Sequence, residues 1–253
     1  MAMKWNSTWL RMALTAVCCT CSVGAYADTV TVAVAANFSS TAQRIASDFS
    51  RASGHEVKQV PGATGKLYAQ IKNGAPFHVL LSADDETPAR LVKEGGALAS
   101  SQFTYATGRL VLWSAQTGLV DNQGQVLTTS FTRLAIADPK LAPYGAAAME
   151  VLAKRGLLPS VQTRLVQGES IAQTYQFVAT GNAPLGFVAL SQVMRNGQID
   201  QGSAWRVPAE LHQPLRQDAV LLQAGVGQAA AVAFLDYLRS DAARKVMQSA
   251  GYE

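Results

Sequence analysis

The sequence predicts a two-lobed α/β fold, in which each lobe is a mainly parallel sheet flanked by helices and a ligand cleft lies between the lobes. Two observations predict it. Short apolar runs rich in β-branched residues alternate with segments of helical periodicity, and this alternation occurs in two successive series. Each series has about 110 residues, the size of one lobe. Because a strand–helix–strand order implies parallel strands, we expect ligands at the carboxyl ends of the strands.

The first 27 residues have the order of a secretory signal. Lys4 and Arg11 precede an apolar run at residues 12–23. The small-x-small triplet at 25–27 then predicts cleavage before Asp28. The apolar run has about 12 residues, short of the roughly 20 that span a bilayer. An uncleaved membrane anchor is therefore disfavoured.

Removal of this signal changes the charge and the cysteine content of the chain. The formal charge falls from +4 to +2 with the loss of Lys4 and Arg11, so the mature 226 residues give no indication of a nucleic-acid partner. All three cysteines lie at residues 18–21, which leaves none for a disulfide or a thiolate metal site. With 49% hydrophobic and 15% charged residues, the chain is too apolar for a disordered class. An exported chain without cysteine fits a bacterial-type periplasm.

The first series begins directly after the signal. Residues 29–35 (TVTVAVA) predict a buried strand, and the apolar residues between Phe38 and Phe49 recur at helical spacing. The other elements expected in this lobe are strands at 56–60 and 79–81 and helices at 67–71 and 87–94.

The second series begins after Gly108, with an apolar segment at residues 109–113. Its expected strands are 134–137, 163–166, 185–188 and 219–223, and its expected helices are 143–155, one from Ser170, 228–239 and 241–250. We assign residues 28–108 and 224–253 to the first lobe and residues 109–223 to the second. The chain is expected to cross between the lobes near 109–114 and 218–223.

Enzyme and metal motifs are scarce in the mature sequence. Its histidines, His55, His78 and His212, lie far apart and without carboxylates or cysteines at ligand spacing. The segment Gly62-Ala63-Thr64-Gly65-Lys66 is not a Walker A loop, because Val60 and Leu67 stand where that motif needs glycine and serine or threonine. We expect neither a catalytic site nor a free metal cation.

Four strand-to-helix turns, two in each lobe, point instead to an anion. They are residues 36–40, 62–66, 143–145 and 169–171. Ser40 with Gln43 and Ser170 with Gln173 are in capping-box register, and Pro143 stands where a missing N–H costs nothing. Each helix start presents free N–H donors and the positive end of the helix dipole.

Such a cleft, lined by N–H, hydroxyl and amide donors, suits a small and fully deprotonated oxyanion. A protonated phosphate would need an acceptor for its hydrogen. Glu169 is the only carboxylate in these turns. Phosphate is therefore disfavoured.

Several segments resemble, in the right order and over essentially the whole mature chain, the family of periplasmic molybdate-binding proteins of molybdate ABC importers. They are residues 31–49, 62–76, 80–84, 137–139, 144–145, 168–171, 182–186, 234–238 and 251–252. The resemblance implies a periplasmic binding protein fold and a molybdate or tungstate ligand. It implies no cofactor, no counter-cation, molybdenum bound only as its oxyanion, and a monomer. The expected partner is a membrane permease with a cytoplasmic ATPase, and not nucleic acid.

The resemblance also implies which residues bind the anion. Ala36 and Asn37 fall on the first binding loop, Thr64 on the second, and Tyr144 and Ile171 on the third and fourth, mainly through main-chain N–H groups. Asn37 and Thr64 are expected to donate from their side chains as well. Further candidates are Ser39, Ala63 and Ala189.

Two positions depart from the family pattern. Ala189 stands where some members supply a tyrosine hydroxyl, so that contact is absent or replaced, with Tyr144 as the candidate replacement. His78 stands where the family often has aspartate, and we expect this position to act in the scaffold.

Two alternatives remain open from the sequence. One is a receptor for sulfate or another tetrahedral oxyanion, which would use similar dipoles around a smaller cavity. The other is a periplasmic hydrolase of an anionic substrate, suggested by Lys66 and Glu169 beside a polar cleft. The sequence lacks a recognisable set of nucleophile, base and orienting group, which argues against the hydrolase.

Overall fold

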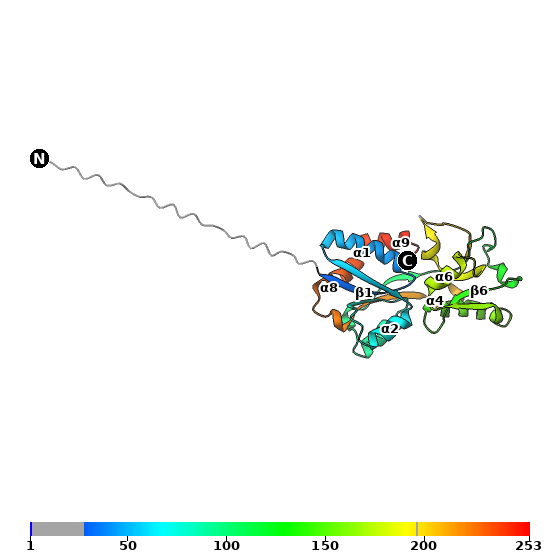
Figure 1. Cartoon of the computed structure of the whole chain (residues 1–253), viewed down its shortest axis with the longest axis horizontal. Coiled ribbons are helices and arrows are strands. Elements are labelled where there is room, and N and C mark those ends of the chain that lie inside the picture. Colours follow the sequence, from blue (N-terminus) through cyan, green and yellow to red (C-terminus); the bar gives the residue numbers. More distant parts are fainter. Residues whose placement is uncertain (2–27, 196) are drawn as a thin grey trace.

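The structure is a computed structural model that describes Met1 and residues 28–195 and 197–253 (Figure 1). The expected secretory signal lies outside the described residues. Two lobes, each built on a five-stranded sheet with helices against it, follow one another along the long axis of the molecule (Figure 1). In the part of the chain that is described, no helix combines the length and the apolar character needed to cross a membrane.

The sheet of the first lobe has the order β2-β1-β3-β12-β4. Its strands are β1 (Thr29–Ala35), β2 (Glu56–Gly62), β3 (Val79–Leu81), β4 (Phe103–Gly108) and β12 (Leu215–Leu221). Its helices are α1 (Ser39–Ser53), α2 (Thr64–Lys72), α3 (Glu86–Lys93), α8 (Ala229–Leu238) and α9 (Asp241–Ser249).

Alternation along β1 divides these helices between the two faces of the sheet. Val32 and Val34 share an apolar cluster with Phe49 of α1 and Phe234 of α8. Ala33, between the two valines, belongs to the opposite cluster, which contains residues of α2 and α3. The first lobe is therefore a three-layer unit with the sheet in the middle.

The sheet of the second lobe has the order β11-β5-β8-β6-β7. Its strands are β5 (Leu110–Ser114), β6 (Leu134–Ala137), β7 (Leu165–Gly168), β8 (Leu185–Ala189) and β11 (Ser203–Arg206), beside a hairpin of β9 (Met194–Arg195) and β10 (Gln198–Ile199). Its helices are α4 (Pro143–Lys154), α5 (Leu158–Val161), α6 (Ile171–Ala179) and α7 (Leu190–Val193). Short 3₁₀ turns in the two lobes are Ala99–Ser101, Gln125–Thr128, Gln162–Arg164, Ala209–Leu211 and Gln223–Gly225.

The expected α/β architecture is confirmed, and both sheets are mixed: four of the five strands in each sheet run in one direction, and the fifth is antiparallel to its two neighbours. In the first lobe β1 is parallel to β2 and β3, whereas β12 is antiparallel to β3 and β4. In the second lobe β6 is parallel to β7 and β8, whereas β5 is antiparallel to β8 and β11. The antiparallel pairs follow from the connection between lobes, because a strand that leaves a lobe and one that returns to it run in opposite directions.

The strand order also places the return of the chain to the first lobe earlier in the sequence than expected. We expected residues 109–223 in the second lobe, but β12 begins at Leu215 and lies in the sheet of the first lobe. The consecutive polar residues Arg216, Gln217 and Asp218 hide the first half of this strand from a search for apolar runs, so the expected strand began only at residue 219. The outward crossing falls between β4 and β5, within the expected segment at 109–114.

Candidate anion-binding site

Four of the helices that follow a parallel strand form the candidate site. In the first lobe α1 follows β1 and α2 follows β2, and in the second α4 follows β6 and α6 follows β7. Each of these strand pairs is parallel, so its two helix starts lie at the same edge of the sheet. The two edges meet, because the amide N–H of Gly65 at the start of α2 donates to the carbonyl of Leu141 just before α4, at 2.9 Å.

One main-chain N–H at each of the four turns has no protein acceptor among the described residues. These donors belong to Asn37, Thr64, Tyr144 and Ile171, and the four residues are at most 3% exposed. Free N–H groups are a property of every helix start, but a buried donor without a partner is costly. Four such donors from two lobes therefore favour a bound acceptor between them.

The remaining expected residues contribute differently. The N–H of Ala36 donates to the carbonyl of Gly62 at 2.9 Å and extends the β1–β2 ladder, so it is already used. Ala189 is fully buried, and its N–H donates to Oε1 of Gln192 at 2.9 Å. Ser39 is the first residue of α1, half-buried, and Ala63 is the buried N-cap of α2.

Thr64 keeps a side-chain donor for a ligand. Its Oγ1 accepts a hydrogen bond from the N–H of Ala83 at 3.3 Å, which leaves the hydroxyl hydrogen available. Thr64 therefore offers two donors from one residue at the start of α2.

Asn37 differs from the expectation that its side chain donates to the anion. Its Nδ2 donates to Oε1 of Gln217 at 3.0 Å and to the hydroxyl of Tyr252 at 3.1 Å, so both hydrogens have protein acceptors. The free donor of Asn37 is its main-chain N–H.

Five residues beside the site were missed by the sequence reasoning. They are Ser82, Tyr105, Ser191, Gln217 and Tyr252, which form hydrogen bonds with Asn37, with Tyr144 or with one another. They come from separate parts of the sequence, and the only available signal was the row of polar residues inside the apolar segment around Gln217. Burial raises the pKa of Tyr105, Tyr144 and Tyr252 above the ordinary value, so all three hydroxyls stay protonated near neutral pH.

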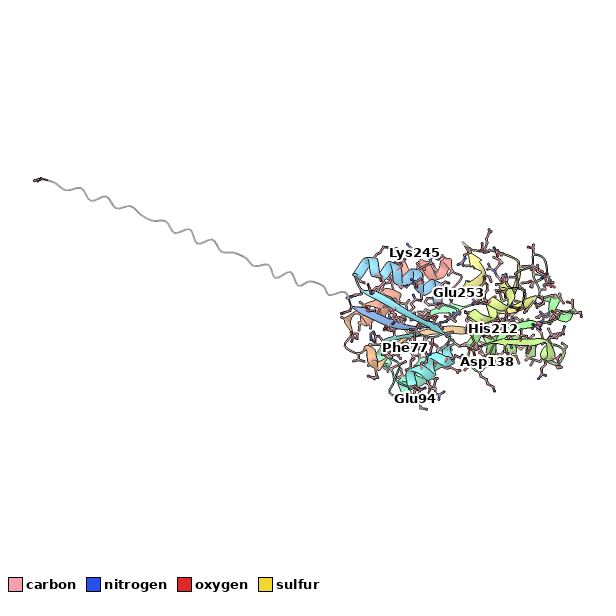
Figure 2. All side chains as sticks on the ribbon, viewed as in Figure 1. Phe77, Glu94, Asp138, His212, Lys245 and Glu253 are labelled. Atoms are coloured by element: carbon pink, nitrogen blue, oxygen red, sulfur yellow. The ribbon has the colours of Figure 1, made fainter. Side chains whose placement is uncertain are left out.

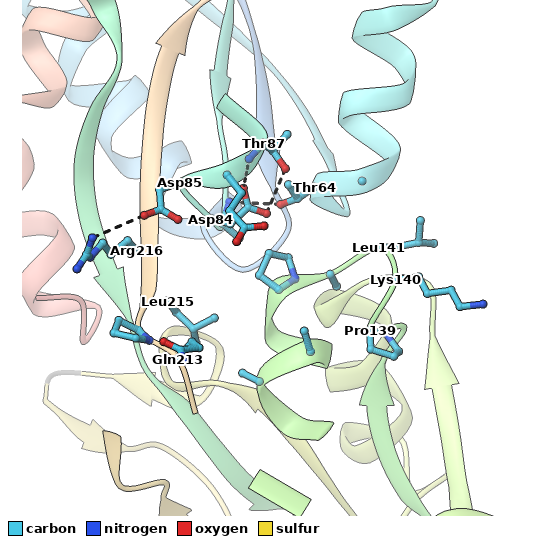
Figure 3. Close-up of a pocket in the computed structure, with 18 of the residues that line it drawn as sticks. Thr64, Asp84, Asp85, Thr87, Pro139, Lys140, Leu141, Gln213, Leu215 and Arg216 are labelled. Atoms are coloured by element: carbon cyan, nitrogen blue, oxygen red, sulfur yellow. Dashed lines mark hydrogen bonds and ion pairs between the residues drawn. The ribbon is translucent and has the colours of Figure 1, made fainter. Parts of the chain in front are cut away.

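A groove of about 560 Å³ between the lobes leads to Thr64 (Figure 3). One wall carries Asp84, whose carboxylate accepts from the N–H of Thr87 at 2.9 Å, and whose pKa is raised by burial. Asp85 and Arg216 form an ion pair of 3.8 Å at its edge (Figure 3). Of the four donor residues, only Thr64 lines this groove.

The charged pair at the rim of the site joins the two lobes. Lys66 Nζ lies 2.5 Å from Glu169 Oε2, and both side chains are largely exposed. The pair therefore links α2 of the first lobe to the residue before the N-cap of α6 in the second.

The histidines lie elsewhere, in the scaffold. Nδ1 of His78 accepts from the N–H of Thr31 at 3.1 Å, beside β1, in agreement with the scaffold role expected for it. Nδ1 of His55 accepts from the N–H of Asp28, and Nδ1 of His212 lies 2.7 Å from the carbonyl of Gln213. Among the described residues, no cluster of three or more histidine, cysteine, aspartate or glutamate side chains could hold a metal ion.

Comparisons with known proteins agree on one family. Residues 30–253 match the family model of bacterial extracellular solute-binding proteins. The chain is 53% identical to the molybdate-binding protein ModA of Azotobacter vinelandii over 251 residues, 99% of each chain. It is 50% identical to ModA of Rhodobacter capsulatus over 228 residues, 90% of this chain and 89% of the relative. The solved structure of the A. vinelandii periplasmic molybdate-binding protein superposes with a TM-score of 0.86 at 42% identity, over 88% of this chain and 98% of that one.

Proposed function

The chain belongs to the bacterial extracellular solute-binding proteins and, among them, to the ModA molybdate-binding proteins, and from this we propose that it captures molybdate between its two lobes. The observation that supports the proposal most directly is the set of four buried, unpartnered N–H donors, two from each lobe. Each lies at the start of a helix of nine residues or more, so fixed dipoles favour a negative charge there.

The site is proposed to consist of Asn37, Thr64, Tyr144 and Ile171. The N–H groups of all four residues and the Thr64 hydroxyl would donate to the oxygens of the anion. Ala36 would shape the first loop without donating, because its N–H is bonded to Gly62. No cation is needed, since the donors are neutral groups fixed in a dehydrated site.

The donor set favours a fully deprotonated tetrahedral dianion. Molybdate and tungstate have the same charge and shape, so we propose that tungstate binds as well. Hydrogen phosphate carries a proton that needs an acceptor, and the nearest carboxylate in the binding turns, Glu169, is paired with Lys66.

The proposed role is capture and delivery without chemical conversion. We propose that the protein acts in the periplasm as a monomer after cleavage before Asp28, and that it delivers the anion to a membrane permease with a cytoplasmic ATPase. The relatives ModA of A. vinelandii and of R. capsulatus are molybdate-binding proteins, which supports binding over hydrolysis.

Calorimetric titration of the purified protein with molybdate, tungstate, sulfate and phosphate tests this proposal. We expect one molybdate or tungstate per chain, with much weaker binding of sulfate and phosphate. Fluorescence of Trp113 and Trp205, both in the second lobe, provides an independent readout. Sulfate binding as tight as molybdate binding would replace the proposal with a sulfate receptor, and hydrolysis of a phosphoester that is lost in Glu169→Gln would replace it with an enzyme.

A further inference from the structure

Five buried side chains form a hydrogen-bonded network that joins the lobes beside the candidate site. Asn37, Gln217 and Tyr252 belong to the first lobe, and Tyr144 and Ser191 belong to the second. None is more than 5% exposed. We call these five residues the interlobe network.

Gln217 links Asn37 to Tyr144. Its Oε1 accepts from Nδ2 of Asn37 at 3.0 Å, and its Nε2 donates to the hydroxyl of Tyr144 at 3.2 Å. The carboxamide can satisfy both bonds in only one orientation. A side chain of the first lobe is therefore locked against one of the second.

Tyr252 and Ser191 hold Asn37 from the other side. Oγ of Ser191 donates to the Asn37 carbonyl at 3.0 Å. The Tyr252 hydroxyl lies 2.8 Å from the same carbonyl and 2.9 Å from Oγ of Ser191, and it accepts from Nδ2 of Asn37. Both the main-chain carbonyl and the side-chain amide of Asn37 are thus fixed.

The backbone around the network is shaped to permit these contacts. The pairing of β12 with β4 skips Tyr105 between Gln217 and Asp218, an irregularity of the kind that redirects a side chain. A Cβ atom on Gly108 would lie 2.1 Å from the Tyr144 hydroxyl and 2.5 Å from Nε2 of Gln217. Only glycine leaves room for that pair at the outward crossing.

The last residues of the sequence hold Tyr252 in place. The N–H and carbonyl of Glu253 both bond to Thr107 of β4, at 3.1 and 2.7 Å, and the Glu253 carboxylate pairs with Arg109. The Tyr252 ring packs edge-on against Phe38, with 5.2 Å between centroids. Glu253 lies near the middle of the long axis, where the lobes meet (Figure 2).

We infer that Gln217 and Tyr252 are positioning residues of the anion site, which fix Asn37 through a hydrogen-bond network completed only when Tyr144 and Ser191 of the second lobe are in place. The inference rests on the proposed function. Separation of the lobes breaks the bonds to Tyr144 and Ser191 but leaves those among Asn37, Gln217 and Tyr252. The network therefore couples the geometry of the Asn37 N–H to lobe closure, and its loss is expected to speed anion release.

The variants Tyr252→Phe and Gln217→Leu test the inference. Each removes hydrogen-bonding atoms while keeping most of the side-chain volume. We expect the Kd for molybdate to rise about tenfold, the size of one such hydrogen bond, mainly through a faster dissociation rate in stopped-flow measurements. The matched control is Tyr237→Phe, since Tyr237 lies in the same lobe and packs on Phe49 away from the network.

A purely structural role predicts a different result. It would lower the melting temperature of the ligand-free protein and leave the Kd and the dissociation rate of the folded fraction unchanged, which would overturn the inference. Ser191→Ala adds a probe from the second lobe. We expect the fold-increase in Kd of the double variant Tyr252→Phe/Ser191→Ala to be smaller than the product of the fold-increases of the two single variants. The reason is that both hydroxyls contact the Asn37 carbonyl. Independent, multiplicative effects would also contradict it.

The outcome separates the inference from the proposed function. If the unaltered protein binds none of the four oxyanions, the proposed function fails. If it binds molybdate and the variants bind and release it at the same rates as the unaltered protein, only the positioning role fails.

Discussion

Thr64 is the residue at which the site can be tested with the least disturbance. Its hydroxyl hydrogen is available, while its Oγ1 accepts from the N–H of Ala83. We expect Thr64→Ala to weaken molybdate binding by about 1.5–3 kcal/mol, the value of a hydrogen bond to a charged group. Calorimetry checks this, with Thr64→Ser as the control that keeps the hydroxyl. Equal Kd values for Thr64→Ala and the unaltered protein would show that the hydroxyl does not face the anion.

Tyr144 acts through both its main chain and its side chain in this structure. From the sequence, Tyr144 was expected to act mainly through its main-chain N–H, with its hydroxyl as a candidate replacement for the contact missing at Ala189. Because the hydroxyl accepts from Gln217 across the lobes, we expect Tyr144→Phe to weaken binding by about 1 kcal/mol. The measurement is a molybdate titration, and an unchanged Kd would return Tyr144 to a main-chain role alone.

The anchor positions of the site were accessible from the sequence, but its supporting side chains were not. The four strand-to-helix turns follow from the local sequence pattern, and the family resemblance assigned Asn37, Thr64, Tyr144 and Ile171 within them. Gln217 and Tyr252 reach Asn37 from 180 and 215 residues away. No local rule predicts such a contact, because it depends on how the two lobes are packed.

Two helix starts show when a capping pattern in the sequence predicts the N-cap correctly. The Ser170–Gln173 pair is confirmed, since Oγ of Ser170 accepts from the N–H of Gln173. The Ser40–Gln43 pair is wrong as a cap, because α1 begins at Ser39 with Phe38 at the N-cap and no side-chain cap. The carbonyl of Phe38 accepts the first helical bond from Ala42, so the backbone turn after β1 sets the start of this helix.

This difference gives a matched pair of variants. We expect Ser170→Ala to lower the free energy of unfolding by about 1 kcal/mol, through loss of an N-cap, and to weaken molybdate binding through a less ordered start of α6. Ser40→Ala, at an exposed position inside α1, should change neither quantity. Thermal unfolding and calorimetry of both variants check the pair, and a similar loss in the two would refute the assigned caps.

The strands that the sequence missed also have a common physical reason. β4 and β11 consist largely of partly exposed residues, and three polar residues in a row hid the first half of β12, of which only the part from residue 219 was expected. Apolar runs reveal central strands such as β1 and β8. They do not reveal connecting strands, whose polar side chains are satisfied by partners elsewhere in the fold.

At the scale of the whole molecule, the buried tyrosines make the free energy of unfolding depend on alkaline pH. Burial raises the pKa of Tyr105, Tyr144 and Tyr252 above the ordinary 10.0. Protonated tyrosine is thus favoured by folding, so this stability is fully present below pH about 10 and is lost as the pH rises through the folded-state pKa values. We expect the free energy of unfolding to fall above that pH, and less steeply in Tyr252→Phe. Denaturant unfolding across this range checks it, and identical slopes in the two proteins would contradict it.

The Lys66–Glu169 pair offers two positions for labels that report the spacing of the lobes. It marks two surface positions, one on each lobe, that are adjacent in this arrangement. Residues 28–253 contain no cysteine, so Lys66→Cys with Glu169→Cys would create the only two thiols for dye attachment in that segment. A donor–acceptor dye pair placed there would turn the spacing of the lobes into an optical signal, and the protein into a reagentless sensor for its oxyanion.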